Sequence, residues 1–113
     1  MRNGVAVGLD VGLVLVFVAI GRASHEEGAS LAGFAGTAWP FLVGLAAGWG
    51  VTRAWRRPEV LVPSGVGIWA ATVVVGMLLR AVSGQGTAFA FVVVATSFLA
   101  AVLLGWRLIA RFL

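Results

Sequence analysis

The chain has 113 residues, of which 61% are hydrophobic and only 11% are charged, and its formal net charge is +4. Soluble domains carry roughly a quarter charged residues, so this composition excludes an ordinary soluble domain, a disordered chain and a basic nucleic-acid-binding arm. Because one membrane-spanning helix needs about 20 apolar residues, four spans would use most of the chain.

The first predicted element is a helix at about residues 5–21, and its apolar run is interrupted only by Asp10. An acidic residue at the centre of a membrane helix costs about 2.5–3.5 kcal/mol and is usually paired or functional. One interpretation makes Asp10 a carboxylate that carries a proton or cation. The others make it a structural ion-pair partner of Arg107 or Arg53, or a shallow group that water reaches.

A polar segment follows this helix and contains Arg22, His25 and Glu26. If the helix continues through it, Arg22 and Glu26 are i,i+4 partners. Arg80 is expected at the same depth, and two guanidinium groups at one depth could bind an anion or a lipid phosphate. The alternative is that both arginines cap helix ends and pair with Glu26 and Glu27. His25 could also sense pH.

The second predicted element is a helix at about residues 31–52, and it contains Trp39 and Pro40. Pro40 has no backbone N–H to donate to the Gly36 carbonyl, which predicts a kink in this helix. Thr37 could satisfy a group freed in this way, and a small cavity is expected near Trp39.

The last two predicted elements are helices at about residues 64–82 and 87–107. The third apolar run is short, and it reaches spanning length only if Pro63 is included and Arg80 extends to the membrane surface. Strand alternation is absent, and a bilayer requires backbone hydrogen bonds within each span. The sequence therefore predicts an all-α polytopic membrane protein, with residues 1–113 forming one compact bundle of four transmembrane helices in two tandem hairpins.

The arginines predict the orientation of this bundle. Six flank the membrane side that holds both termini, and two, Arg22 and Arg80, flank the other side. The six are Arg2, Arg53, Arg56, Arg57, Arg107 and Arg111. The positive-inside rule then places both termini in the cytoplasm. Four tryptophans fall near the same interface, where indole is favoured, namely Trp49, Trp55, Trp69 and Trp106.

Small residues recur every four positions, which allows helices to approach one another closely. The three series are Gly4, Gly8 and Gly12; Gly36, Pro40, Gly44 and Gly48; and Ser97, Ala101 and Gly105. A weak internal repeat aligns Arg22 with Arg80 and, with one residue of slippage, Gly48-Trp49 with Gly105-Trp106. Such a repeat predicts a pseudo-two-fold axis along the membrane normal.

Three sequence elements carry a family resemblance. They are Gly21-Arg22-Ala23-Ser24-His25, Trp39-Pro40-Phe41 and Gly76-Met77-Leu78-Leu79-Arg80. With Asp10, they resemble a family of bacterial and archaeal membrane proteins, the domain of unknown function numbered three thousand and fifty-four. The resemblance extends over nearly the whole chain. It implies four helices and a membrane location, and it implies no activity.

The functional prediction is a small, non-enzymatic integral protein of the cell membrane that acts as an accessory or interaction subunit. The chain has no cysteine and one histidine, and we expect no catalytic residue, cofactor or metal. The expected partners are membrane lipid and a homo-oligomer or larger membrane complex, without nucleic acid. The alternative is a homo-oligomeric transporter or channel for a small solute, proton or ion. Asp10 would carry the coupling proton or cation, and Arg22, His25 and Arg80 would line the entrance.

Overall fold

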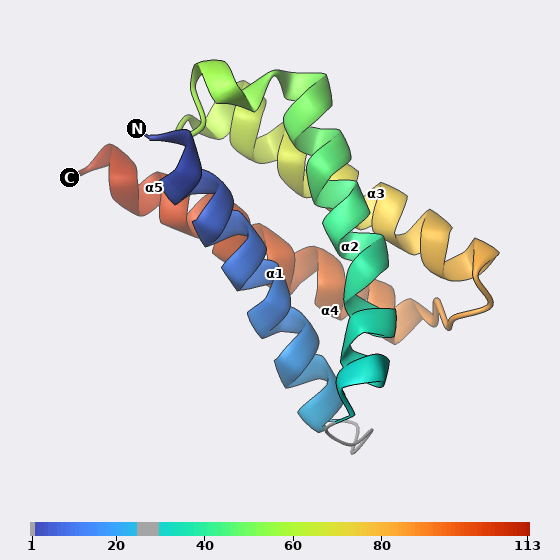
Figure 1. Ribbon diagram of the computed structural model, residues 1–113. Coiled ribbons are helices and arrows are strands. Elements are labelled where there is room, and N and C mark those ends of the chain that lie inside the picture. The colour runs from blue at the N-terminus through green and yellow to red at the C-terminus, as the bar shows by residue number, and fades with distance from the viewer. Residues whose placement is uncertain (1, 25–29) are drawn as a thin grey trace.

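The computed structural model describes residues 2–24 and 30–113, and these residues form helices and no strands. Four helical stretches are long and apolar enough to cross a membrane, which confirms the predicted all-α architecture. They are α1 (Asn3–Ser24), α2 (Leu31–Thr52), a third stretch built from η2 (Leu61–Gly65) and α3 (Val66–Val82), and a last stretch built from α4 (Phe89–Leu99), η3 (Ala100–Leu104) and α5 (Gly105–Arg111) (Figure 1). His25, Glu26 and Glu27 lie outside the described residues.

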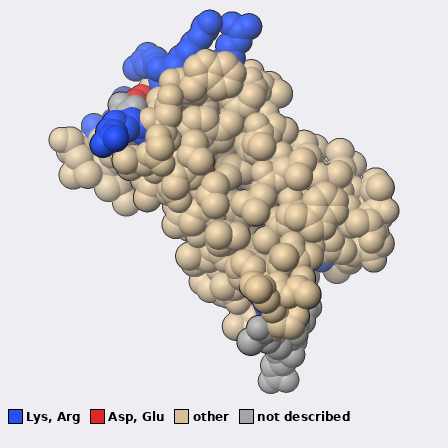
Figure 2. Space-filling model, in the orientation of Figure 1, with Lys and Arg blue, Asp and Glu red and all other residues tan. Residues whose placement is uncertain are grey.

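Both chain termini lie at one end of the bundle, together with the connection between α2 and α3 (Figure 1). We call this the terminal end. The opposite end, where α1 ends, α2 begins and α3 turns into α4, is the turn end. Arginine side chains gather at the terminal end (Figure 2). The exposed arginines of the described chain include Arg2, Arg53, Arg56, Arg57 and Arg111.

The closest helix packing is between α2 and α3. The helix α2 belongs to the first predicted hairpin and α3 to the second, so this packing joins the two hairpins. A Cβ atom added at Gly44 would lie 2.9 Å from the Thr72 Cα, and one added at Gly48 would lie 2.7 Å from the Ile68 Cα. The two backbones touch because these positions carry no side chain. One small-residue series thus serves packing within the chain.

Phenylalanine rings fill the middle of the bundle. The Phe17 ring of α1 lies 5.3 Å from the Phe41 ring of α2, with the rings nearly perpendicular. The Phe17 ring also lies 5.6 Å from the Phe98 ring of α4. Edge-to-face and tilted ring pairs are favourable geometries, so this cluster joins three helices at the level between the two ends.

Two helix boundaries differ from the predicted ones for identifiable reasons. The third span begins with η2 (Leu61–Gly65), a short segment that is kinked at Val62, before α3. Val62 within it is extended, with φ −124° and ψ 127°, because the ring of Pro63 disfavours the helical region for the residue before it. The last span runs from Phe89 to Arg111, four residues beyond the predicted end, because Arg107 is buried inside the bundle instead of ending the helix at the membrane surface.

Candidate functional site

Asp10 is completely buried, and the helical spacing of α1 explains its direction. Ala6, Asp10 and Val14 are spaced four residues apart, and all three have no exposed surface. Residues at this spacing share one helix face, so the apolar neighbours that face the bundle core also turn the carboxylate toward it.

The partner of Asp10 is Arg107, one of the two arginines that the sequence offered for a structural pair. Arg107 Nη1 donates to Asp10 Oδ1 at 2.9 Å, and Nη2 donates to Oδ2 at 2.7 Å. Both side chains have no exposed surface. This two-point geometry is the strong form of an arginine–carboxylate interaction.

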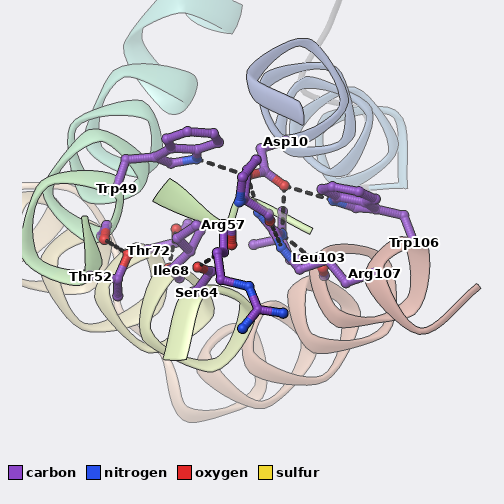
Figure 3. Close-up of polar contacts among 12 residues, drawn as sticks. Asp10, Trp49, Thr52, Arg57, Ser64, Ile68, Thr72, Leu103, Trp106 and Arg107 are labelled. Atoms are coloured by element: carbon purple, nitrogen blue, oxygen red, sulfur yellow. Dashed lines mark hydrogen bonds and ion pairs between the residues drawn. The ribbon is translucent and has the colours of Figure 1, made fainter. Parts of the chain in front are cut away.

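Two tryptophans complete the carboxylate's hydrogen bonds. Trp49 Nε1 of α2 donates to Asp10 Oδ2 at 2.9 Å, and Trp106 Nε1 of α5 donates to Oδ1 at 2.8 Å. The two indoles approach the carboxylate from opposite sides (Figure 3). Each oxygen therefore accepts two hydrogen bonds, which fills the roughly four acceptor sites of a carboxylate. We call Asp10, Trp49, Trp106 and Arg107 the Asp10 cluster.

The remaining contacts of Arg107 extend the cluster to the α2–α3 connection. Arg107 Nε donates to the Pro58 carbonyl at 2.8 Å, and Nη1 also donates to the Leu103 carbonyl at 3.0 Å. A Cβ atom at Gly65 would lie 2.9 Å from Arg107 Cδ, so the glycine leaves room for the arginine's stem. Within the described residues, no buried side-chain nitrogen or oxygen lacks a hydrogen-bond partner.

The wide turn η3 explains how the last span keeps Arg107 on its buried face. Ala95, Leu99, Leu103 and Arg107 are all buried and are spaced four residues apart. In an ideal helix three such steps would rotate the face by about 120°. The wider turn between Ala100 and Leu104 has more residues per turn, so residues four apart stay closer to one helix face and this rotation is smaller. Single π turns of this kind often occur at functional or structural sites in helices.

The turn end holds a second, separate polar group. Arg22 Nη1 donates to Thr37 Oγ1 at 2.9 Å, which ties α1 to α2. Arg80 Nη1 donates to Gln85 Oε1 and Arg80 Nε to the Gly86 carbonyl, each at 2.9 Å. Arg22 and Arg80 line the same cavity, and Asp10 is not part of its lining. The expected Arg22–Glu26 pair and the roles proposed for His25 involve residues outside the described chain.

Pro40 leaves the Gly36 carbonyl without its helical hydrogen bond, and the partner of this carbonyl is not Thr37, which the sequence suggested. The Gly36 carbonyl, which Pro40 cannot satisfy, accepts a hydrogen bond from Gln85 Nε2 at 3.0 Å. Thr37 instead donates to the Gly33 carbonyl at 3.1 Å. Helix α2 is continuous through Pro40.

The sequence predicts a small cavity near Trp39. The Trp39 side chain is 40% exposed on the bundle surface. A cavity at this end is lined by Arg22, Thr37, Arg80 and Gln85, with Phe17, Val18 and Phe91 among its other residues, and Trp39 is not part of its lining. We call it the turn-end cavity.

Sequence reasoning missed the roles of Trp49 and Trp106, which it placed at the membrane interface. One signal could have found them, because the weak internal repeat aligned Gly48-Trp49 with Gly105-Trp106. The repeat's other pair, Arg22 and Arg80, meets at the turn-end cavity. Residues that the weak repeat aligns therefore lie near one another at both ends of the bundle.

The chemistry of the Asp10 cluster is that of a closed structural pair. The carboxylate is desolvated and its acceptor sites are filled, so its geometry favours connecting helices over exchanging a proton or ion. No group of three or more His, Cys, Asp or Glu side chains that could hold a metal ion occurs among the residues described.

Comparison with known proteins gives one family. Residues 7–110 match the family described as "Protein of unknown function (DUF3054)". The chain belongs to this family. The match includes Asp10, both tryptophans of its cluster and Arg107, so the DUF3054 region contains the whole Asp10 cluster. No curated protein and no solved structure matches the chain.

A double-mutant cycle tests the Asp10–Arg107 pair. Asp10→Asn and Arg107→Met should each lower the free energy of unfolding by about 3–5 kcal/mol, because each leaves one buried charge without its partner. The double variant should lose much less than the sum of the two. The measurement is reversible unfolding in mixed micelles, followed by tryptophan fluorescence.

Arg111→Met is the matched control, because Arg111 is exposed four residues further along the same helix. Its effect should stay within about 0.5 kcal/mol. Additive losses in the Asp10→Asn/Arg107→Met double variant would contradict a direct coupling between the two side chains.

Proposed function

We propose that this multi-pass membrane protein is a non-enzymatic interaction subunit of the cell membrane, and that it associates laterally with another transmembrane helix through α1. The observation that carries the proposal is the outward glycine series of α1. Gly4, Gly8 and Gly12 are exposed, and a Cβ atom added at any of them would meet nothing within 4 Å.

The chain itself shows what this spacing does when a helix partner is present. Gly44 and Gly48 of α2 have the same spacing, and α3 packs directly on them. In membranes, small residues at this spacing allow close backbone contact between helices. The α1 series has the same pattern and no such contact within the described chain.

The Asp10 cluster determines which way this glycine series faces. Residues two apart on a helix are separated by about 200°, so Gly8 and Gly12 lie roughly opposite Asp10. The ion pair that turns Asp10 toward Arg107 therefore turns these glycines away from the bundle. Because the rotation of α1 is fixed, the helix would present the same face to every partner. The helix would then lose less conformational entropy when a partner binds.

The arginines support an orientation with both termini in the cytoplasm. Arg107 is buried in its ion pair and no longer counts as a flanking charge. Five exposed arginines remain at the terminal end, namely Arg2, Arg53, Arg56, Arg57 and Arg111. Only Arg22 and Arg80 belong to the turn end, so the bias still favours this orientation.

Lateral association is tested with Gly8→Leu and its control Gly50→Leu, each purified from native membranes in mild detergent. Neither side chain would meet an atom within 4 Å at its Cβ, so both variants should fold. Wild type and Gly50→Leu should be recovered with a second copy or another membrane protein. Gly8→Leu should be recovered as a single protomer, with association weakened at least about tenfold.

Two results would contradict lateral association through α1. One is recovery of the wild-type protein only as a single protomer. The other is unchanged association in Gly8→Leu. A third variant, Gly48→Leu, should fail to fold because its side chain would collide with the α3 backbone at Ile68, which shows that the assay distinguishes inward from outward glycines.

The second candidate function is a homo-oligomeric transporter or channel that uses Asp10. One observation favours it: a cavity of about 830 Å³ at the terminal end is lined by Arg107, together with Arg57 and Arg111. Transport through Asp10 would require the carboxylate to leave Arg107 during each cycle, although every acceptor site is filled in this structure.

Liposome flux separates the two functions. Protein reconstituted in liposomes should give no more proton or ion flux than empty liposomes if the first proposal is right. If flux is present and Asp10→Asn abolishes it while the protein stays folded, Asp10 carries the transported charge. Flux that is unchanged in Asp10→Asn removes Asp10 from any transport mechanism.

A further inference from the structure

The turn-end cavity has a volume of about 400 Å³ and combines two positive charges with an apolar wall. Its charged residues are Arg22 and Arg80. Its apolar residues include Phe17, Val18 and Phe91. We propose that this cavity binds the phosphate group of an anionic amphiphile, with the phosphate between the two guanidinium groups and an apolar chain along the phenylalanines.

Both guanidinium groups are held in place by neighbouring groups. The hydroxyl of Thr37 accepts from Arg22, and Gln85 and the Gly86 carbonyl accept from Arg80. The Arg80 guanidinium also lies 4.4 Å from the centre of the Phe91 ring. Guanidinium matches phosphate geometry with two parallel hydrogen bonds, and groups positioned in advance lose less entropy on binding.

The polar and apolar residues of this cavity separate with depth. Arg22 and Arg80 each belong to the last turn of their helices, α1 and α3. Phe17 is five residues before Arg22 on α1, which places it about 7–8 Å deeper in the bundle. A ligand that reaches from the arginines to Phe17 would therefore need a charged head and an apolar tail.

The depth of the arginines favours a membrane lipid over a soluble phosphate. Arg22 and Arg80 lie at or just beside the ends of two apolar spans, at the level where lipid headgroups surround a membrane protein. An acyl chain could extend from there along Phe91, which is partly exposed in the cavity, whereas Val18 and Phe17 are almost fully buried. A free phosphate would use the arginines but not this wall.

The cavity offers a substitution that fills it without removing either charge. Gly21 lines the cavity, and a Cβ atom added there would meet nothing within 4 Å. Gly21→Leu should therefore fold and occupy ligand space. The matched control is Gly50→Leu, because Gly50 is equally open and does not belong to the cavity lining.

The experiment is native mass spectrometry of the full chain in detergent, titrated with short-chain phosphatidylglycerol, short-chain phosphatidylcholine or inorganic phosphate. The wild-type protein and Gly50→Leu should bind phosphatidylglycerol with similar affinity. Gly21→Leu and the Arg22→Gln/Arg80→Gln variant should bind it roughly tenfold or more weakly, as expected for the loss of charge-assisted hydrogen bonds. If the arginine variant fails to fold, Gly21→Leu decides the result.

Three other binding results would overturn part or all of this proposal. Binding of inorganic phosphate that is lost in the arginine variant, without preference for phosphatidylglycerol, would support the phosphate site and overturn the lipid as its source. Equal affinity of wild type for phosphatidylglycerol and phosphatidylcholine would overturn selection of an anionic ligand. Unchanged phosphatidylglycerol binding in Gly21→Leu would overturn the cavity as the site.

A Glu26→Gln/Glu27→Gln variant tests the neutral alternative, in which these carboxylates serve as the arginines' anions. The proposal expects phosphatidylglycerol binding that is equal or stronger, because removing two negative charges lowers the electrostatic repulsion of an anion. Weaker binding in this variant would contradict the proposal. The inference does not depend on lateral association through α1, and Gly8→Leu should leave lipid binding unchanged.

Discussion

The buried contact between Asp10 and Arg107 is the constraint on which the rest of the bundle depends. A desolvated ion pair is stable only when both members are fully hydrogen-bonded. Here the carboxylate of α1 accepts from α2 and from two residues of α5, and the arginine reaches the α2–α3 connection at Pro58. One pair therefore fixes the rotation of α1, the height of α5 and the path of residues 57–65.

The two ends of the molecule use their charged residues differently. At the terminal end, charge is enclosed and used to join helices, while the surrounding arginines are exposed (Figure 2). At the turn end, Arg22 and Arg80 line a cavity. The phenylalanine rings of the middle region lie between them and keep the two polar groups apart. The function proposed for α1 and the ligand proposed for the turn end thus rest on different parts of one rigid frame.

Much of this was predictable from sequence, because membrane helices are governed by length, hydropathy and the cost of unpaired charge. The four spans followed from apolar length, and Arg107 followed as one of two partners for Asp10. Trp49 and Trp106 did not, since indole is expected both at membrane interfaces and beside buried acceptors, and only three-dimensional packing distinguishes the two. Gln85 was missed because the Gly36 carbonyl is 49 residues away in the chain. The outward direction of Gly8 could not be predicted either, because it depends on the rotation of α1 about its axis, and the ion pair fixes that rotation.

The most direct test of the central claim is nuclear magnetic resonance of the indole N–H groups of Trp49 and Trp106. If both donate to the Asp10 carboxylate, their protons should exchange slowly with deuterated water, and both resonances should shift in Asp10→Asn. Trp55, which is 51% exposed, should exchange fast and stay in place. Fast exchange of Trp49 and Trp106 in the wild-type protein, or resonances that do not move in Asp10→Asn, would contradict the account.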